Sequence, residues 1–138
     1  MENNFNSTFT LETAKENEIS TEKTGTRKPG GICPLLTQSV VARLPLCDIN
    51  YFLGEGRRTR IVMKGGGDYR MGEKITFFER FMDEAFYRQG KYYINLSNVV
   101  SVTSDAEVTF DDGTKIYFTK KTYVGLKQSF ARFILEGR

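Results

Sequence analysis

Three short groups of basic and polar side chains are the residues of this sequence best suited to binding chemistry. They are Arg57-Arg58-Thr59-Arg60, Arg88-Gln89-Gly90-Lys91 and Lys120-Lys121-Thr122. Each group combines a cation with a side chain, Arg, Gln or Thr, that can bond a phosphate or a base edge. Each also falls at a predicted turn or strand end. Because Arg and Lys end surface loops in most soluble proteins, the spacing alone permits DNA or RNA binding without requiring it.

Catalysis finds little support in the residue types. The sequence has no His, which removes the commonest general base and the commonest metal ligand. Gly65-Gly66-Gly67 lacks the Lys-Ser/Thr of a phosphate-binding loop, and Asp111-Asp112 lies in a turn, where aspartate is common. Cys33 and Cys47 form no Cys-x-x-Cys motif, so we expect two reduced, buried or half-buried thiols, with a redox-sensitive pair as the alternative. We expect no enzyme, no metal and no cofactor.

The composition fits one folded domain preceded by a polar tail. Of the 138 residues, 39% are hydrophobic, including eleven Phe and seven Tyr, which is enough apolar material for a core. Residues 1–31 are instead rich in Asn, Ser, Thr, Glu and Lys, and we expect them to form a disordered tail. Residues 32–138 are the expected domain.

Charge and targeting signals limit the partners. The net charge of +3 lies entirely beyond residue 47, because residues 1–47 hold five Lys or Arg and five Glu. A polyanion is therefore permitted as a partner of the folded part. Because no secretory signal opens the chain and no apolar run approaches the length of a membrane span, we expect a cytoplasmic protein without a membrane partner.

Alternating apolar residues separated by turn signals predict a mainly β domain. The best-defined hairpin places Val108 and Phe110 on one strand and Ile116 and Phe118 on the next, with Asp112-Gly113 as its turn. This hairpin delivers the cations of the third basic group at its end. Further strands are expected at 39–44, 49–53, 57–63, 69–71 and 99–102, with a strand, a glycine bend and a strand across 85–96.

Two short helices complete the expected elements. Ile75, Phe78 and Met82 recur at helical spacing and predict the first helix across 74–82. Thr122 is the expected cap of the final helix, which ends near Gly137. Its predicted buried face consists of Leu126, Phe130, Phe133 and Ile134.

Five segments have the order and spacing of motifs from one known family. Leu44–Phe52 resembles the pattern P-x-x-D-I-x-Y-I-E, and Gly56–Ile61 resembles G-N-Y-T-x-I. Met71–Phe81 fits a helix pattern R-x-S/T-L-x-x-L-E-x-x-L, and Phe86–Val102 fits F-x-R-x-H-R-S-Y-I-V-N-L-x-x-I-x-x-I. Asp112–Tyr123 fits D-G-x-x-I-x-V-S-R-R. Through these five segments together, the sequence resembles the LytTR-type DNA-binding domain of bacterial transcriptional regulators.

The sequence departs from the family pattern at three places. Leu53 stands where the family has Glu, and Gln89–Tyr92 stands where the family has H-R-S-Y when the segment is anchored on Asn95. A shift of one residue would instead place Lys91 on the family's Arg. The family's paired Arg after the hairpin are Lys120-Lys121 here. Because Lys keeps the charge but lacks the bidentate fork that suits guanine, we expect more phosphate contact at this pair.

The resemblance implies a compact stack of small antiparallel β-sheets with one or two short helices. It also implies that loops and strand ends enter two successive major grooves and cross the minor groove between them. By position, these loops are Arg57-Arg58-Thr59, Gln89-Gly90-Lys91 and Lys120-Lys121. With Arg60 and Thr122 from the same basic groups, the predicted DNA-binding residues are Arg57, Arg58, Thr59, Arg60, Gln89, Gly90, Lys91, Lys120, Lys121 and Thr122.

The function that the resemblance implies is a stand-alone, sequence-specific regulator that binds double-stranded DNA at direct-repeat promoter sites, with a homodimer on DNA as one arrangement. An interaction module that pairs with or inhibits another transcriptional regulator is the alternative, because no sensor domain is expected.

Overall fold

The computed structural model describes residues 30–137, which form ten strands, three short 3₁₀ helices and one α-helix. The tail predicted for residues 1–31 lies, up to residue 29, outside the described residues. The strands are β1 (Ile32–Leu36), β2 (Val41–Pro45), β3 (Ile49–Glu55), β4 (Arg58–Met63), β5 (Asp68–Met71), β6 (Phe86–Gln89), β7 (Tyr92–Asn95), β8 (Val99–Val102), β9 (Glu107–Phe110) and β10 (Lys115–Tyr117). The helices are η1 (Leu46–Asp48), η2 (Ile75–Phe81), η3 (Leu96–Asn98) and α1 (Tyr123–Gly137).

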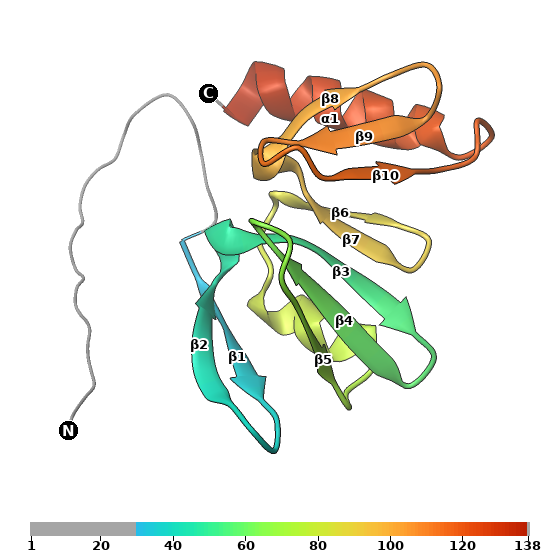
Figure 1. The fold of residues 1–138 in the computed structure, drawn as a ribbon. Coiled ribbons are helices and arrows are strands. Elements are labelled where there is room, and N and C mark those ends of the chain that lie inside the picture. The colour runs from blue at the N-terminus through green and yellow to red at the C-terminus, as the bar shows by residue number, and fades with distance from the viewer. Residues whose placement is uncertain (1–29, 138) are drawn as a thin grey trace.

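The strands form three separate antiparallel sheets, which confirms the predicted mainly β class. A central sheet has the order β5-β4-β3-β7-β6, a second has the order β10-β9-β8, and β1 pairs with β2 alone. Figure 1 shows the three-stranded sheet above the central sheet and the β1–β2 hairpin to its left. The predicted hairpin that precedes the third basic group is β9–β10, with Ile116 opposite Val108.

The central sheet has a hydrophobic core on each face. Because neighbouring residues of a strand point to opposite faces, Phe52 and Ile61 enter one core while Tyr51 and Val62 enter the other. Phe52 is fully buried and meets the Phe78 ring at a centroid distance of 5.3 Å. Burial on both faces explains why apolar residues stand side by side in these strands, as in Ile61-Val62-Met63 of β4.

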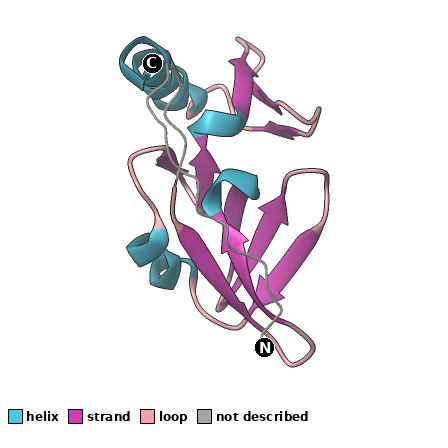
Figure 2. Cartoon of the chain, turned by 90° about the vertical axis from the view of Figure 1, so that its left-hand side faces the viewer, coloured by secondary structure: helices cyan, strands magenta, loops and turns pink. Residues whose placement is uncertain are grey.

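Different elements cover the two faces. The β1–β2 hairpin and η2 bring Leu35 and Phe78 to the first core. The β8–β9–β10 sheet and α1 bring Phe110 and Leu126 to the second. In Figure 2, α1 and η2 lie on the outside of the strands.

The helices follow the predicted positions but differ in type and in one buried residue. The first is a 3₁₀ helix, in which Ile75, Phe78 and Phe81 recur every third residue, the period of a helix with three residues per turn. In α1, Leu126 and Phe130 are buried as expected, but Ile134 is 58% exposed, so its predicted burial is wrong. No helix within residues 30–137 has the length and apolarity needed to cross a bilayer.

No disulfide joins Cys33 to Cys47, in line with the two reduced thiols that the sequence predicts. Cys33 is fully buried in the first core, and Cys47 is partly exposed. Burial raises the pKa of the Cys33 thiol to about 11, which keeps it protonated and unreactive at neutral pH.

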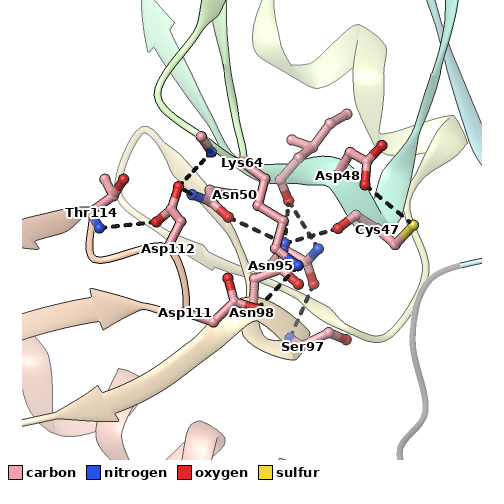
Figure 3. A network of polar contacts seen from close by, with 12 residues as sticks. Cys47, Asp48, Asn50, Lys64, Asn95, Ser97, Asn98, Asp111, Asp112 and Thr114 are labelled. Atoms are coloured by element: carbon pink, nitrogen blue, oxygen red, sulfur yellow. Dashed lines mark hydrogen bonds and ion pairs between the residues drawn. The ribbon is translucent and has the colours of Figure 1, made fainter.

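A network of buried asparagines joins the central sheet to the β9–β10 turn (Figure 3). Asn98 Nδ2 donates to Asn50 Oδ1 at 3.2 Å, and Asn50 Nδ2 donates to Asp112 Oδ2 at 3.1 Å. Asp112 also accepts from the amides of Gly65 at 2.7 Å and Thr114 at 2.9 Å. Asp112 therefore holds the β4–β5 turn and its own turn together, beyond the local role that a turn aspartate would have.

Acid is expected to weaken this network. Burial acts to raise the pKa of Asp112, but hydrogen bonds from Gly65, Thr114 and Asn50 outweigh it and hold the pKa below its usual value. Its stabilisation is therefore fully present above the ordinary aspartate pKa and is lost as the pH falls through that value to the folded-state pKa. Urea unfolding at a series of acidic pH values should show a smaller pH dependence for Asp112→Asn than for the wild type. Identical pH dependence in the two proteins would contradict this assignment, and Asp105→Asn, at an exposed aspartate of another turn, is the control.

Candidate nucleic-acid interface

The first basic group occupies a tight turn between β3 and β4. Glu55 pairs with Arg58, which leaves Gly56 and Arg57 as the two turn residues. Gly56 has a φ of 70°, a left-handed conformation that glycine adopts without strain. The turn therefore displays Arg57 and Arg58 as exposed side chains.

The second group occupies the turn between β6 and β7. Gln89 pairs with Tyr92, so Gly90 and Lys91 form a two-residue turn, and Gly90 has a φ of 62°. Lys91 is exposed at its tip. The turn is braced by Arg88, whose Nε donates to the Gly90 carbonyl at 3.2 Å.

The third group lies in the loop between β10 and α1. The amides of Thr122 and Tyr123 both donate to the Thr119 carbonyl, at 3.0 and 3.2 Å, and form a turn that leads into α1. Thr122 Oγ1 lies 2.9 Å from Thr119 Oγ1 inside this turn. Lys120 and Lys121 are exposed at its outside.

Two hydrogen bonds hold these three loops side by side. The Gly54 amide donates to the Lys91 carbonyl at 2.8 Å, which joins the end of β3 to the β6–β7 turn. Gln89 Nε2 donates to the Thr122 carbonyl at 3.0 Å, which joins the same turn to the β10–α1 loop. The β6–β7 turn is therefore the middle of the three, and Figure 1 shows all three on the right-hand side of the molecule.

Five of the predicted site residues form an exposed set of cations, which we call the cation row. Its members are Arg57, Arg58, Lys91, Lys120 and Lys121. Within residues 30–137, no ion pair is made by any of them. Their charges are free to meet an anion that spans the three loops.

Four other predicted residues are engaged within the protein. Thr59 is fully buried and its hydroxyl donates to the Glu73 carbonyl at 2.8 Å, so it does not face a partner. Arg60 lies 2.7 Å from Glu55 and 3.6 Å from Asp68. The hydroxyl of Thr122 bonds the Thr119 hydroxyl within its own loop. The side-chain amide of Gln89 bonds the Thr122 carbonyl on the neighbouring loop.

Ion pairs near the first turn neutralise a carboxylate that would otherwise offset the charges of Arg57 and Arg58. Glu55, at the base of the turn, is met by Arg60 and, at 3.4 Å, by Arg70. The nearest carboxylate is thus neutralised from within the sheet. Arg70 was not among the predicted site residues, and its position opposite Arg60 in the β4–β5 register is the signal that could have found it.

Arg88 is a second residue that the predicted site list lacks. Its guanidinium lies 3.7 Å from Glu79 and 5.4 Å from the centre of the Tyr93 ring. Burial and the neighbouring Glu79 carboxylate raise the pKa of Tyr93, whose hydroxyl donates to Glu79. Arg88 therefore belongs to a cluster that stiffens the β6–β7 turn. Among the described residues, no three His, Cys, Asp or Glu side chains gather as a metal site.

Comparisons with known proteins identify the family and the fold of the chain. The sequence model of the LytTr DNA-binding domain matches residues 39–131. Among solved structures, the chain is similar to a LytTr DNA-binding domain from Bacillus cereus, with a TM-score of 0.59 and 12% sequence identity. That similarity covers 72% of this chain and 95% of the other. No curated protein sequence matches the chain.

Proposed function

The chain belongs to the LytTR family of DNA-binding domains, and we propose that it is a sequence-specific transcriptional regulator that binds double-stranded DNA through its cation row. The observation that carries the proposal is the joining of three turns, each with exposed cations, by two inter-loop hydrogen bonds. Phosphates on a duplex are spaced regularly, and a rigid row of cations matches them better than scattered ones.

The order of the loops supports a specific docking arrangement. The β3–β4 turn and the β10–α1 loop are the outer two, and each would enter one of two successive major grooves. The β6–β7 turn lies between them and would face the intervening minor groove. Gly90 at this turn has no side chain, and no atom lies within 4 Å of the position that a Cβ would take, so a DNA backbone could approach it closely.

The chemical types in the cation row suggest different tasks for its ends. Arg57 and Arg58 carry planar guanidinium groups that can bond guanine through two hydrogen bonds. Lys120 and Lys121 lack that fork and suit phosphates. Thr59 is left out of the proposed contact set because it is buried.

We place this function in the bacterial cytoplasm, with two copies on a direct-repeat site as the proposed assembly on DNA. Selection of duplexes from a random pool tests the proposal, and the expected result is enrichment of one repeated motif. No enrichment, together with co-purification of a protein partner, would favour the alternative that the domain pairs with another regulator.

Lys121→Ala is expected to weaken binding to all duplexes alike. If Lys121 meets a phosphate, its loss should also lower the slope of log K against log salt by about one. The measurement is fluorescence anisotropy with the selected duplex and a shuffled one at several salt concentrations. Lys115→Ala is the matched control, because Lys115 is an exposed lysine at the opposite end of β10, paired with Glu107 at 3.5 Å. A loss confined to the selected duplex would instead assign Lys121 to base reading.

A further inference from the structure

The side chain of Gln89 links two loops that lie 33 residues apart in sequence. Its amide donates to the Thr122 carbonyl, so the bond runs from the β6–β7 turn to the residue that immediately precedes α1. Gln89 is only partly exposed, in contrast to Lys91 beside it. The geometry directs this side chain toward the neighbouring loop.

The Gln89 end of this link is rigid. Gln89 is the last residue of β6 and pairs with Tyr92 across the turn. Arg88 fixes the turn from the adjacent position by bonding Gly90 and by meeting Glu79. A side chain that extends from such a base can define the position of the loop that it bonds.

A second contact joins β6 to the same part of the third loop. A Cβ at Gly125, in the first turn of α1, would lie 2.9 Å from the Tyr87 hydroxyl. That distance is too short for a real side-chain contact, so α1 approaches β6 as closely as it does because residue 125 is glycine. Tyr87 and Gln89 therefore set the position of the start of α1 together.

From these contacts we infer that Gln89 is a positioning residue, which sets where Lys120 and Lys121 lie relative to the β6–β7 turn, and does not read a base itself. This inference rests on the proposed DNA binding. It predicts that the separation between the minor-groove contact and the outer major-groove contact, and hence the spacing that the protein accepts in its site, depends on an uncharged side chain.

Gln89→Leu tests the inference because it keeps the approximate size and removes the donor. We expect affinity for the selected duplex to fall about tenfold, as the loss of one well-placed hydrogen bond allows. Affinity for a shuffled duplex should fall by a similar factor, because the displaced lysines contact phosphates of any sequence, and the melting temperature should stay unchanged. Gln38→Leu, an exposed glutamine in the β1–β2 turn, is the matched control.

The base-preference profile distinguishes positioning from direct reading. Gln89→Leu, like Lys121→Ala, should leave the base preference of the protein unchanged, and its effect on affinity should shrink when Lys121 is already Ala. Gly125→Ala, which pushes on the same loop through Tyr87, should also weaken binding to both duplexes.

Three results would overturn the inference. They are unchanged affinity of Gln89→Leu for both duplexes, a loss of preference at a base pair, and additive effects in the double variant. Wild-type protein that binds no duplex would instead overturn the proposed function, and the inference with it.

Discussion

Replacing Arg57, Lys91 and Lys121 together by alanine is expected to abolish specific DNA binding while leaving the fold intact. The three side chains lie one on each loop of the cation row and are exposed, so their removal costs no packing. If each contact contributes about 1–3 kcal/mol, the loss is at least about 3 kcal/mol, or about a hundredfold in affinity. The salt slope should fall by about three at the same time. Anisotropy titrations with the selected duplex measure both quantities.

A charge-matched triple variant separates the site from the net charge. Arg43, Lys115 and Arg132 are also exposed, and they lie on β2, at the start of β10 and near the end of α1. Their replacement by alanine removes the same charge, so it should weaken binding only slightly through the long-range field. Equal losses in the two triple variants, or full binding by the first, would refute the proposed interface.

Asn95→Leu is expected to lower the free energy of unfolding by about 3 kcal/mol or more. Asn95 is fully buried at the end of β7, and its Nδ2 donates to the carbonyls of Leu46 and Ile49 at 3.2 and 2.9 Å. Its Oδ1 accepts from the Ser97 amide at 3.0 Å. Leucine has a similar volume but can bond none of these three backbone groups. Urea unfolding followed by circular dichroism measures the change.

The asparagine prediction has a direct control. Gln38→Leu replaces an exposed amide by the same apolar side chain and should change stability by no more than about 0.5 kcal/mol. An equally small change for Asn95→Leu would mean that the buried amide does not support the start of β3. Asn95 is buried and does not face DNA, so Asn95→Leu should weaken DNA binding only under conditions in which part of the protein is unfolded.

Local patterns were sufficient to predict the turns and most strands. Asp112-Gly113 marked the β9–β10 turn, and alternation at Val108, Phe110 and Ile116 marked its strands. Gly56 and Gly90 marked two further turns, where each has a positive φ. These features depend on residues close together in sequence, which is why they can be predicted. The β1 strand was not predicted, because its pairing with β2 is its only sheet partner among the described residues and its sequence contains Pro34.

Whether a single site residue is exposed or engaged within the protein depends partly on contacts between distant segments. Thr59 was grouped with three arginines in sequence, but strand alternation turns it into the first core, where it bonds Glu73. Arg60 lies on the other face and meets carboxylates of β3 and β5. Gln89 bonds a residue on another loop. The alternation of Thr59 with Ile61 could have marked Thr59 as buried, but the partners of Arg60 and Gln89 lie on other segments and leave no local pattern.

The central claim is that the three loops recognise a DNA sequence, and a comparison of two duplexes tests it most directly. The measurement is the dissociation constant, by anisotropy, for the selected duplex and for a shuffled duplex of equal length and composition at two salt concentrations. We predict that the selected duplex binds about a thousandfold more tightly at the same salt, and that binding to both weakens as salt rises. Equal affinity for the two duplexes, unchanged between the salt concentrations, would contradict the account.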